Sequence, residues 1–168
     1  MLAGDVPRKR SFPPVVDPRV RLLVLGSLPG EKSLAAGRYY ANPHNQFWKL
    51  MAAVVARDLE ALDYAARLAA LLDAHVGLWD VVASAHRVGS TDAAIVDLEA
   101  NDLAALVGTL PELRAIAFNG GTALKHGARQ LGDVAHGYAI VPLPSSSPLH
   151  TIGLAAKLPA WLALRAYL

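Results

Sequence analysis

The sequence predicts one α/β domain of three layers, with helices on both faces of a central four-stranded parallel sheet, α/β/α in order. Two observations lead to this fold class. Four short apolar runs alternate with segments of helical periodicity, a pattern typical of a parallel sheet covered on both faces. The chain also has 168 residues, 54% of them hydrophobic, which suffices for one domain with a substantial core.

The four predicted strands are short apolar runs followed by turn-forming or polar residues. They are the run 21–25 and the runs that end at Trp79, Phe118 and Val141. Helical periodicity fills most of the intervening chain. The predicted helices cover residues 47–58, 62–73, 100–107, 122–131 and 154–168.

Residues 1–20 differ from the rest of the chain because they place four prolines among basic residues, Pro7, Pro13, Pro14 and Pro18. Proline removes a backbone donor and fixes φ, so this density argues against regular structure. We therefore expect a basic arm over residues 1–20 that lies across a single domain of residues 21–168.

Composition excludes several classes of protein. No apolar run approaches the ~20 residues that span a bilayer, and the basic start has no signal-peptide core, so we expect a cytoplasmic protein. The absence of cysteine rules out disulfides, thiolate zinc sites and cysteine-bound iron–sulfur clusters. The six histidines show no metal-binding spacing, and we expect no metal and no cofactor.

The charges are unevenly distributed along the chain. Basic residues crowd the segment 8–21, whereas the segment 80–102 carries five acidic residues, although the formal net charge is only +2. A basic face permits a polyanionic partner such as DNA but does not demand one, because basic termini are often merely solvated.

Polar residues follow each predicted strand, at the sheet edge where ligands bind in this fold class. They are the turn Gly26-Ser27-Leu28-Pro29-Gly30, Asp80, the turn Asn119-Gly120-Gly121-Thr122, and the loop 142–148 with its three serines. A strand-to-helix turn favours an anion or carbonyl oxygen, and a serine loop can grip phosphates. Each also has a purely structural alternative as a turn or an Asp cap.

The long connection 26–48 has little apolar periodicity, and such loops in compact domains are usually functional. It holds Tyr40, Asn45, Phe47 and Trp48. The alternative is a surface loop in which Asn45 caps the next helix while Phe47 and Trp48 pack on the sheet.

Together these motifs resemble the uracil-DNA glycosylase superfamily, with the nearest likeness to its hypoxanthine-DNA (deoxyinosine) glycosylase family. The resemblance runs in the expected order from about Val20 to the final helix. Its residues are Gly26 to Gly30, Ser33-Leu34, Tyr39-Tyr40, Pro43, Asn45 and Phe47-Trp48 in the first motif; Gly77 to Val81, Arg87, Gly89-Ser90, Asp92, Asn101-Asp102 and Phe118 to Gly120 in the middle; and Leu143 to Pro148 in the second motif.

The resemblance implies a monofunctional DNA glycosylase of base excision repair. Such an enzyme flips a deaminated base out of DNA and hydrolyses its N-glycosidic bond to leave an abasic site. Hypoxanthine is the expected base, with uracil and xanthine as alternatives. The expected partner is double- or single-stranded DNA, no membrane is involved, and the protein is expected to be a monomer.

The resemblance also assigns roles to individual residues. Asn45 is the expected catalytic residue, assisted by Ser27, which stands where uracil-active relatives carry Asp and mismatch-specific relatives carry Asn. Base binding is expected from Gly26, Tyr40, Phe47, Asp80 and Asn119. DNA binding is expected from Ser145, Ser146, Ser147, Pro148 and Leu149, with the basic segment 8–10 on backbone phosphates and Leu149 filling the gap of the flipped base.

Three alternatives remain open at this point. One lies within the same class, a uracil- or mismatch-specific glycosylase. Another is a lesion-binding protein with little or no catalysis, because the turn 26–30 has no carboxylate. The third is a serine hydrolase in which Ser27 acts with His150 and an aspartate.

Overall fold

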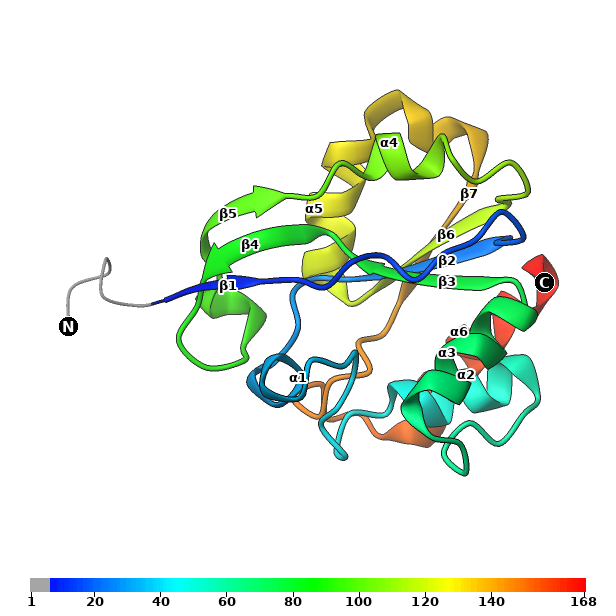
Figure 1. Ribbon diagram of the computed structural model, residues 1–168, viewed down its shortest axis with the longest axis horizontal. Helices are drawn as coiled ribbons and strands as arrows, with labels where there is room; N and C mark the ends of the chain where they lie inside the picture. The colour runs from blue at the N-terminus through cyan, green and yellow to red at the C-terminus, as the bar shows by residue number, and fades with distance from the viewer. Residues whose placement is uncertain (1–6) are drawn as a thin grey trace.

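The computed structural model describes residues 7–168 and places a four-stranded parallel sheet between two layers of helices (Figure 1). The strand order is β3-β2-β6-β7, and every neighbouring pair is parallel. The strands are β2 (Leu22–Gly26), β3 (Val76–Asp80), β6 (Ala115–Asn119) and β7 (Ala139–Leu143). Each predicted apolar run forms one of these strands, so the predicted fold class is confirmed.

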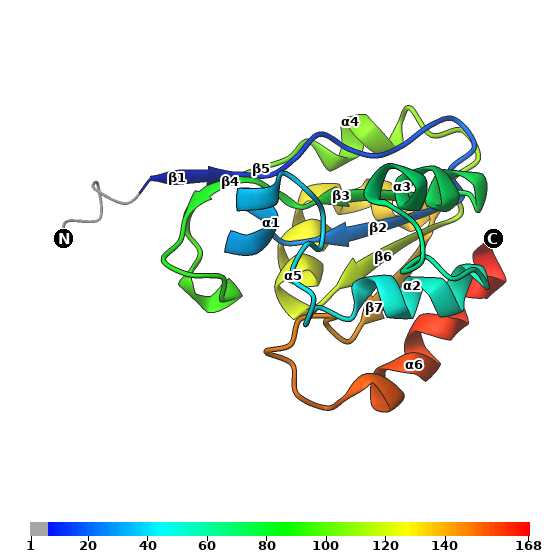
Figure 2. The ribbon, with the colours of Figure 1, turned by 60° about the horizontal axis from the view of Figure 1, so that its bottom comes forward.

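Alternate residues of the central strands face opposite layers of helices, as the two-residue period of a strand requires. Leu22 and Val24 belong to one hydrophobic core, whereas Leu23 and Leu25 belong to the other. The first core is closed by α2 (Phe47–Val55), α3 (Tyr64–Asp73) and α6 (Leu154–Leu162), and the second by α4 (Leu103–Val107) and α5 (Gly121–Leu131) (Figures 1 and 2).

Four of the five predicted helices end earlier or begin later than the apolar pattern predicts, whereas α5 begins one residue earlier, at Gly121. Helix α2 stops at Val55 because Ala56 adopts a left-handed conformation with φ of 55°. Helix α4 begins at Leu103 because the Asp102 carboxylate accepts the backbone N–H of Ala105 and caps it. After α6 the chain tightens into a 3₁₀ helix over Ala163–Tyr167.

A second sheet, which the sequence pattern did not predict, extends from the end of β3. It contains three antiparallel strands in the order β1-β4-β5, namely β1 (Arg8–Arg10), β4 (Val82–His86) and β5 (Val96–Ala100). The expectation that prolines keep residues 1–20 free of regular structure is therefore wrong for β1. The residues between Pro7 and Pro13 include no proline, so their N–H groups can pair with β4.

The N-terminal segment is also bonded to the central sheet. Val15 pairs with Leu78 through two backbone hydrogen bonds of 2.9 Å. Residues 1–6 of the predicted arm lie outside the described residues.

The connection 26–48 contains a short helix, α1 (Glu31–Ala36), that the sequence pattern did not predict. Short 3₁₀ helices follow β4 at Asp92–Ala94 and α5 at Gly132–Gly137. Among residues 7–168, no helix combines the length and apolar character needed to cross a membrane.

Candidate active site

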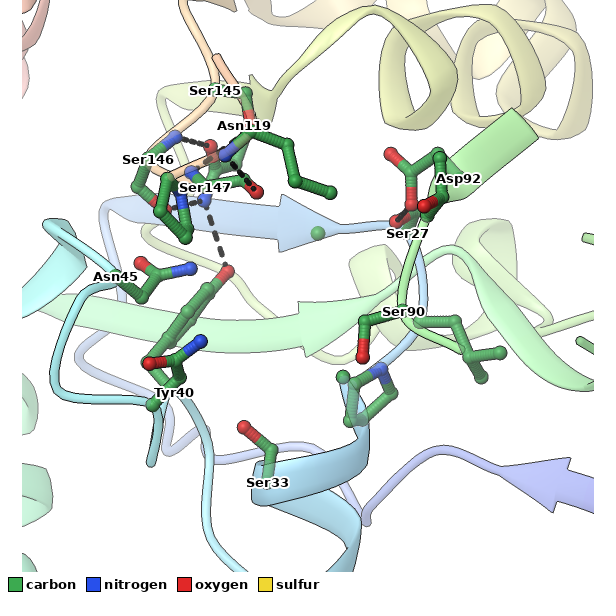
Figure 3. A pocket seen from close by; sticks show the side chains of 18 of the residues that line it. Ser27, Ser33, Tyr40, Asn45, Ser90, Asp92, Asn119, Ser145, Ser146 and Ser147 are labelled. Carbon is green, nitrogen blue, oxygen red and sulfur yellow. Dashed lines mark hydrogen bonds between the residues drawn. The ribbon is translucent and has the colours of Figure 1, made fainter. Parts of the chain in front are cut away.

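One cavity of about 490 Å³ lies where β2, β3 and β6 end and the serine loop begins (Figure 3). These three strands end in residues predicted for the site, Gly26, Asp80 and Asn119. Every predicted site residue except Phe47 lines this cavity. The structure thus brings together side chains from segments far apart in sequence at the ligand-binding edge of a parallel sheet.

Gly26 and Asp80 meet at one wall of the cavity, where the register of β2 and β3 pairs them. A Cβ atom on residue 26 would lie 2.7 Å from Asp80 Oδ1 and 3.0 Å from the Tyr40 hydroxyl. Glycine is required here because any other side chain would displace the carboxyl or the phenol.

Asp80 is a buried carboxyl with unused hydrogen-bonding capacity. Its side chain is 3% exposed, and within residues 7–168 its Oδ2 has no hydrogen-bond partner. Burial, and then the nearby charge of Asp92, raise the pKa of Asp80 to about 7, against the opposing effect of Arg87. A carboxyl that holds a proton near neutral pH can donate as well as accept a hydrogen bond.

Tyr40 forms an aromatic wall of the cavity in a strained backbone conformation, with φ of 53°. Its ring stacks on Phe47 with centroids 3.8 Å apart and an interplanar angle of 13°. Phe47 is fully buried at the start of α2, so it supports Tyr40 from behind, and the expected direct contact between Phe47 and a base does not fit this placement. Burial also raises the pKa of Tyr40, which keeps its hydroxyl protonated.

Asn45 lies one residue before Gln46, the N-cap of α2, so it fixes the turn into the helix without being its cap, and it faces the cavity. Its Oδ1 accepts the backbone N–H of Phe47 at 3.0 Å, which fixes the carboxamide at the entry to α2. Figure 3 shows the amide nitrogen turned toward the cavity. Asn45 can therefore offer a ligand two N–H donors, while its oxygen is already engaged.

Asn119 ties the serine loop to the sheet. Its Oδ1 accepts the Ser146 N–H at 2.9 Å, and its Nδ2 donates to the Ser146 hydroxyl at 2.9 Å and to the Tyr40 hydroxyl at 3.2 Å. Because both ends of the carboxamide have protein partners, base reading by Asn119 would require it to give up one of them. The Tyr40 hydroxyl accepts this bond and keeps its own proton for a ligand.

The serine loop after β7 is held from both sides. Ser146 is 1% exposed, so the surface-facing hydroxyls of the loop belong to Ser145 and Ser147. The fully buried Lys157 donates to the Ser147 carbonyl at 3.2 Å. Leu149 stands at the loop's outer end with 64% exposure, an uncommon position for a large apolar side chain.

The Ser27 hydroxyl donates to Asp92 Oδ1 at 2.6 Å. Asp92 belongs to the connection between β4 and β5 and also lines the cavity, so it supplies the carboxylate that the turn 26–30 lacks. Its position in the middle motif was the one sequence signal that could have pointed to it. The serine hydrolase alternative loses support, because the Ser27 proton is directed to a carboxylate instead of an imidazole.

Arg87 links the turn 26–30 to the connection between β4 and β5. Its guanidinium is 1% exposed and donates to the carbonyls of Leu28, Pro29 and Gly89. The turn 26–30 is therefore fixed to the connection that carries Asp92.

The basic residues of β1 have partners within the fold. Arg8 donates to Ser84 and forms an ion pair with Asp97 at 3.2 Å, and Lys9 donates to the carbonyl of Gly89 at 2.7 Å. Residues 8–10 were expected on phosphates, but of their three basic side chains only that of Arg10 is exposed. Across residues 7–168, no group of three or more His, Cys, Asp or Glu side chains is arranged to hold a metal ion.

The family model of the uracil DNA glycosylase superfamily matches residues 13–165. The chain belongs to this superfamily. As a member it is a DNA glycosylase, a hydrolase of N-glycosidic bonds, and the resemblance seen in its motifs is confirmed.

Two relatives and one solved structure are similar to this chain over most of their length. The chain is 37% identical over 154 residues to a hypoxanthine DNA glycosylase of Methanosarcina barkeri, which covers 92% of this chain and 96% of the relative. It is 40% identical over 139 residues to a hypoxanthine DNA glycosylase of Methanosarcina acetivorans, with coverage of 83% and 86%.

The solved structure is a solution NMR structure from Methanosarcina acetivorans, provisionally assigned as a uracil DNA glycosylase. It superimposes with a TM-score of 0.84 at 36% identity and covers 95% of this chain and 97% of the other. This superfamily member therefore shares the overall fold of that neighbour.

Proposed function

We propose that this glycosylase excises hypoxanthine from DNA, as a monomer, and leaves an abasic site. The observation that carries the proposal is the cavity itself, which combines an aromatic wall with polar groups able to pair with a lactam. The two relatives named hypoxanthine DNA glycosylases support this choice of base.

A flipped hypoxanthine presents a ring N–H beside a carbonyl oxygen. The Asp80 carboxyl, with its raised pKa, carries a donor and an acceptor side by side and can pair with both groups. The Tyr40 ring provides a face on which a base can stack, which is favourable for any nucleobase.

Cleavage of the glycosidic bond leaves negative charge on the departing base. Asn45 meets this charge with an amide donor whose orientation is fixed by the bond between its Oδ1 and the Phe47 N–H. Donors held in place before the reaction stabilise developing charge without reorganisation. Because Asn45 is uncharged and poorly basic, its contribution is electrostatic positioning.

The serine loop is proposed to contact the DNA around the flipped nucleotide. Ser145 and Ser147 can donate to phosphates, and the exposed Leu149 next to Pro148 can occupy the gap left in the base stack. Uracil and xanthine remain further substrates to test.

The test is single-turnover cleavage of matched oligonucleotides that carry one deoxyinosine, deoxyuridine or deoxyxanthosine, single- or double-stranded, with alkali to reveal abasic sites. We expect the fastest cleavage at deoxyinosine. Faster cleavage at deoxyuridine would make the protein a uracil glycosylase instead. Tight binding with no abasic product from any substrate would support the lesion-binding alternative.

A further inference from the structure

We propose that Asp92 is a second catalytic residue of this site, a carboxylate that orients the attacking water and takes its proton, and that Ser27 positions it. The inference rests on the proposed glycosylase function and adds the general base which that function needs.

The contact between Ser27 and Asp92 fixes the direction of both side chains. A hydroxyl has one proton, and Ser27 gives it to Asp92 Oδ1 at 2.6 Å. Among residues 7–168, no hydrogen bond or ion pair engages Asp92 Oδ2, which leaves this oxygen to accept a proton from water. Ser27 therefore acts through Asp92 and has no proton left to donate to the substrate.

The cavity contains other carboxyl groups, but each is engaged differently. Asp80 is buried with a raised pKa and holds its proton near neutral pH. Glu31 is exposed and pairs with Lys9 at 3.4 Å. Asp92 is half-buried and reached by solvent, so it is the carboxylate placed to contact a water molecule.

Asn45 and Tyr40 lie on one side of the cavity in the view of Figure 3, and Asp92 lies with Ser27 on the other. Hydrolysis of a glycosidic bond needs one group that faces the leaving base and another that faces the attacking water. In the proposed step the water oxygen bonds to C1′ as the C1′–N bond breaks and its electron pair stays with the base. The water proton passes to Asp92 and then to solvent, and the base takes up a proton from solvent.

The experiment compares single-turnover cleavage of deoxyinosine DNA by the wild type and by Asp92→Asn. Asparagine still accepts the Ser27 hydroxyl but has no negative charge, so the variant isolates the charge. We expect cleavage to fall by about 10²-fold or more, as for loss of a general base. Affinity for a non-hydrolysable deoxyinosine duplex should stay within about threefold of the wild-type value.

The control is Asp97→Asn, an equal loss of charge at an exposed position of the neighbouring strand β5, outside the cavity. Its cleavage rate should match that of the wild type. Ser27→Ala should lower the rate by about tenfold, and Ser27→Thr, which keeps a hydroxyl, should restore it. These Ser27 variants carry the test if Asp92→Asn does not fold.

Cleavage by Asp92→Asn at the wild-type rate would overturn the inference and leave the proposed function intact. Failure of the wild-type protein to release any base would overturn the proposed function itself, and the two failures are therefore distinguishable. Equal loss in Ser27→Ala and Ser27→Thr would contradict the positioning role of the hydroxyl.

Discussion

Asn45 shows how one side chain can both fix a local turn and be a candidate site residue. Its oxygen is bonded to the Phe47 N–H, so only its amide donors are available to a substrate. Asn45→Asp should keep this turn, because a carboxylate accepts the same bond, but it replaces the donor with an acceptor. We expect both Asn45→Ala and Asn45→Asp to lower single-turnover cleavage by on the order of 10²-fold with little change in DNA affinity.

The Asp variant separates the two roles of Asn45 and is the control for Asn45→Ala. If Asn45→Asp cleaves at the wild-type rate while Asn45→Ala does not, the residue acts through the turn alone. Melting temperatures of the three proteins, measured in parallel, show how much each change affects the fold.

Asp80 links the site to the pH dependence of stability. Its pKa in the fold is about 7, against 3.8 for an ordinary aspartate, so the folded state favours the protonated form. Protonated Asp80 therefore contributes to the stability of the fold in full below pH 3.8, and this stability is lost as the pH rises to about 7. Asp80→Asn should remove the loss and raise the free energy of unfolding at pH 8 by on the order of a few kcal/mol relative to the wild type.

Urea unfolding of the wild type and Asp80→Asn at about pH 5 and about pH 8 measures this difference. Parallel pH dependence in the two proteins would contradict the raised pKa of Asp80.

At the scale of elements, the four apolar strands were predictable because a parallel strand buried on both faces is a nearly continuous apolar run. The strands of the second sheet have no such run. Strand β4 holds alanine, serine and histidine, and β5 alternates exposed and half-buried residues at the edge of its sheet. Strand β4 pairs with β5 and also with β1, which is far away in sequence, and local pattern could not reveal that second pairing.

The packing of α5 on β6 depends on a glycine at a position where helix propensity alone would favour alanine. A Cβ on Gly127 would lie 2.1 Å from Cε1 of the fully buried Phe118. Alanine in a helix is usually favoured over glycine by about 1 kcal/mol, but this overlap should reverse the sign. We expect Gly127→Ala to lower the free energy of unfolding by about 1–3 kcal/mol in urea titrations.

Gly121→Ala is the matched control, because a Cβ at this first position of the same helix meets no atom within 4 Å. It should be neutral or slightly stabilising. A Gly127→Ala protein as stable as Gly121→Ala would show that Phe118 and the helix can move apart at little cost.

At the scale of the whole molecule, the site is an assembly of segments that the fold brings to one edge of the sheet. Gly26, Asp80 and Asn119 were predictable because each follows a recognisable strand. The Ser27–Asp92 pair was not, because Asp92 lies in an irregular connection and reaches Ser27 only through the path of the second sheet. The engagement of Asn119 with Ser146 likewise depends on how β6 and the serine loop approach each other.

The most direct test of the account is to detect free base after one turnover on a duplex with a single deoxyinosine. Mass spectrometry of the small-molecule fraction, with gel analysis of the alkali-treated strand, measures both products together. The wild type is predicted to release hypoxanthine in equal amount to abasic sites, and Asn45→Ala to release about 10²-fold less in the same time. Absence of free hypoxanthine from the wild-type reaction, with DNA bound, would contradict the account.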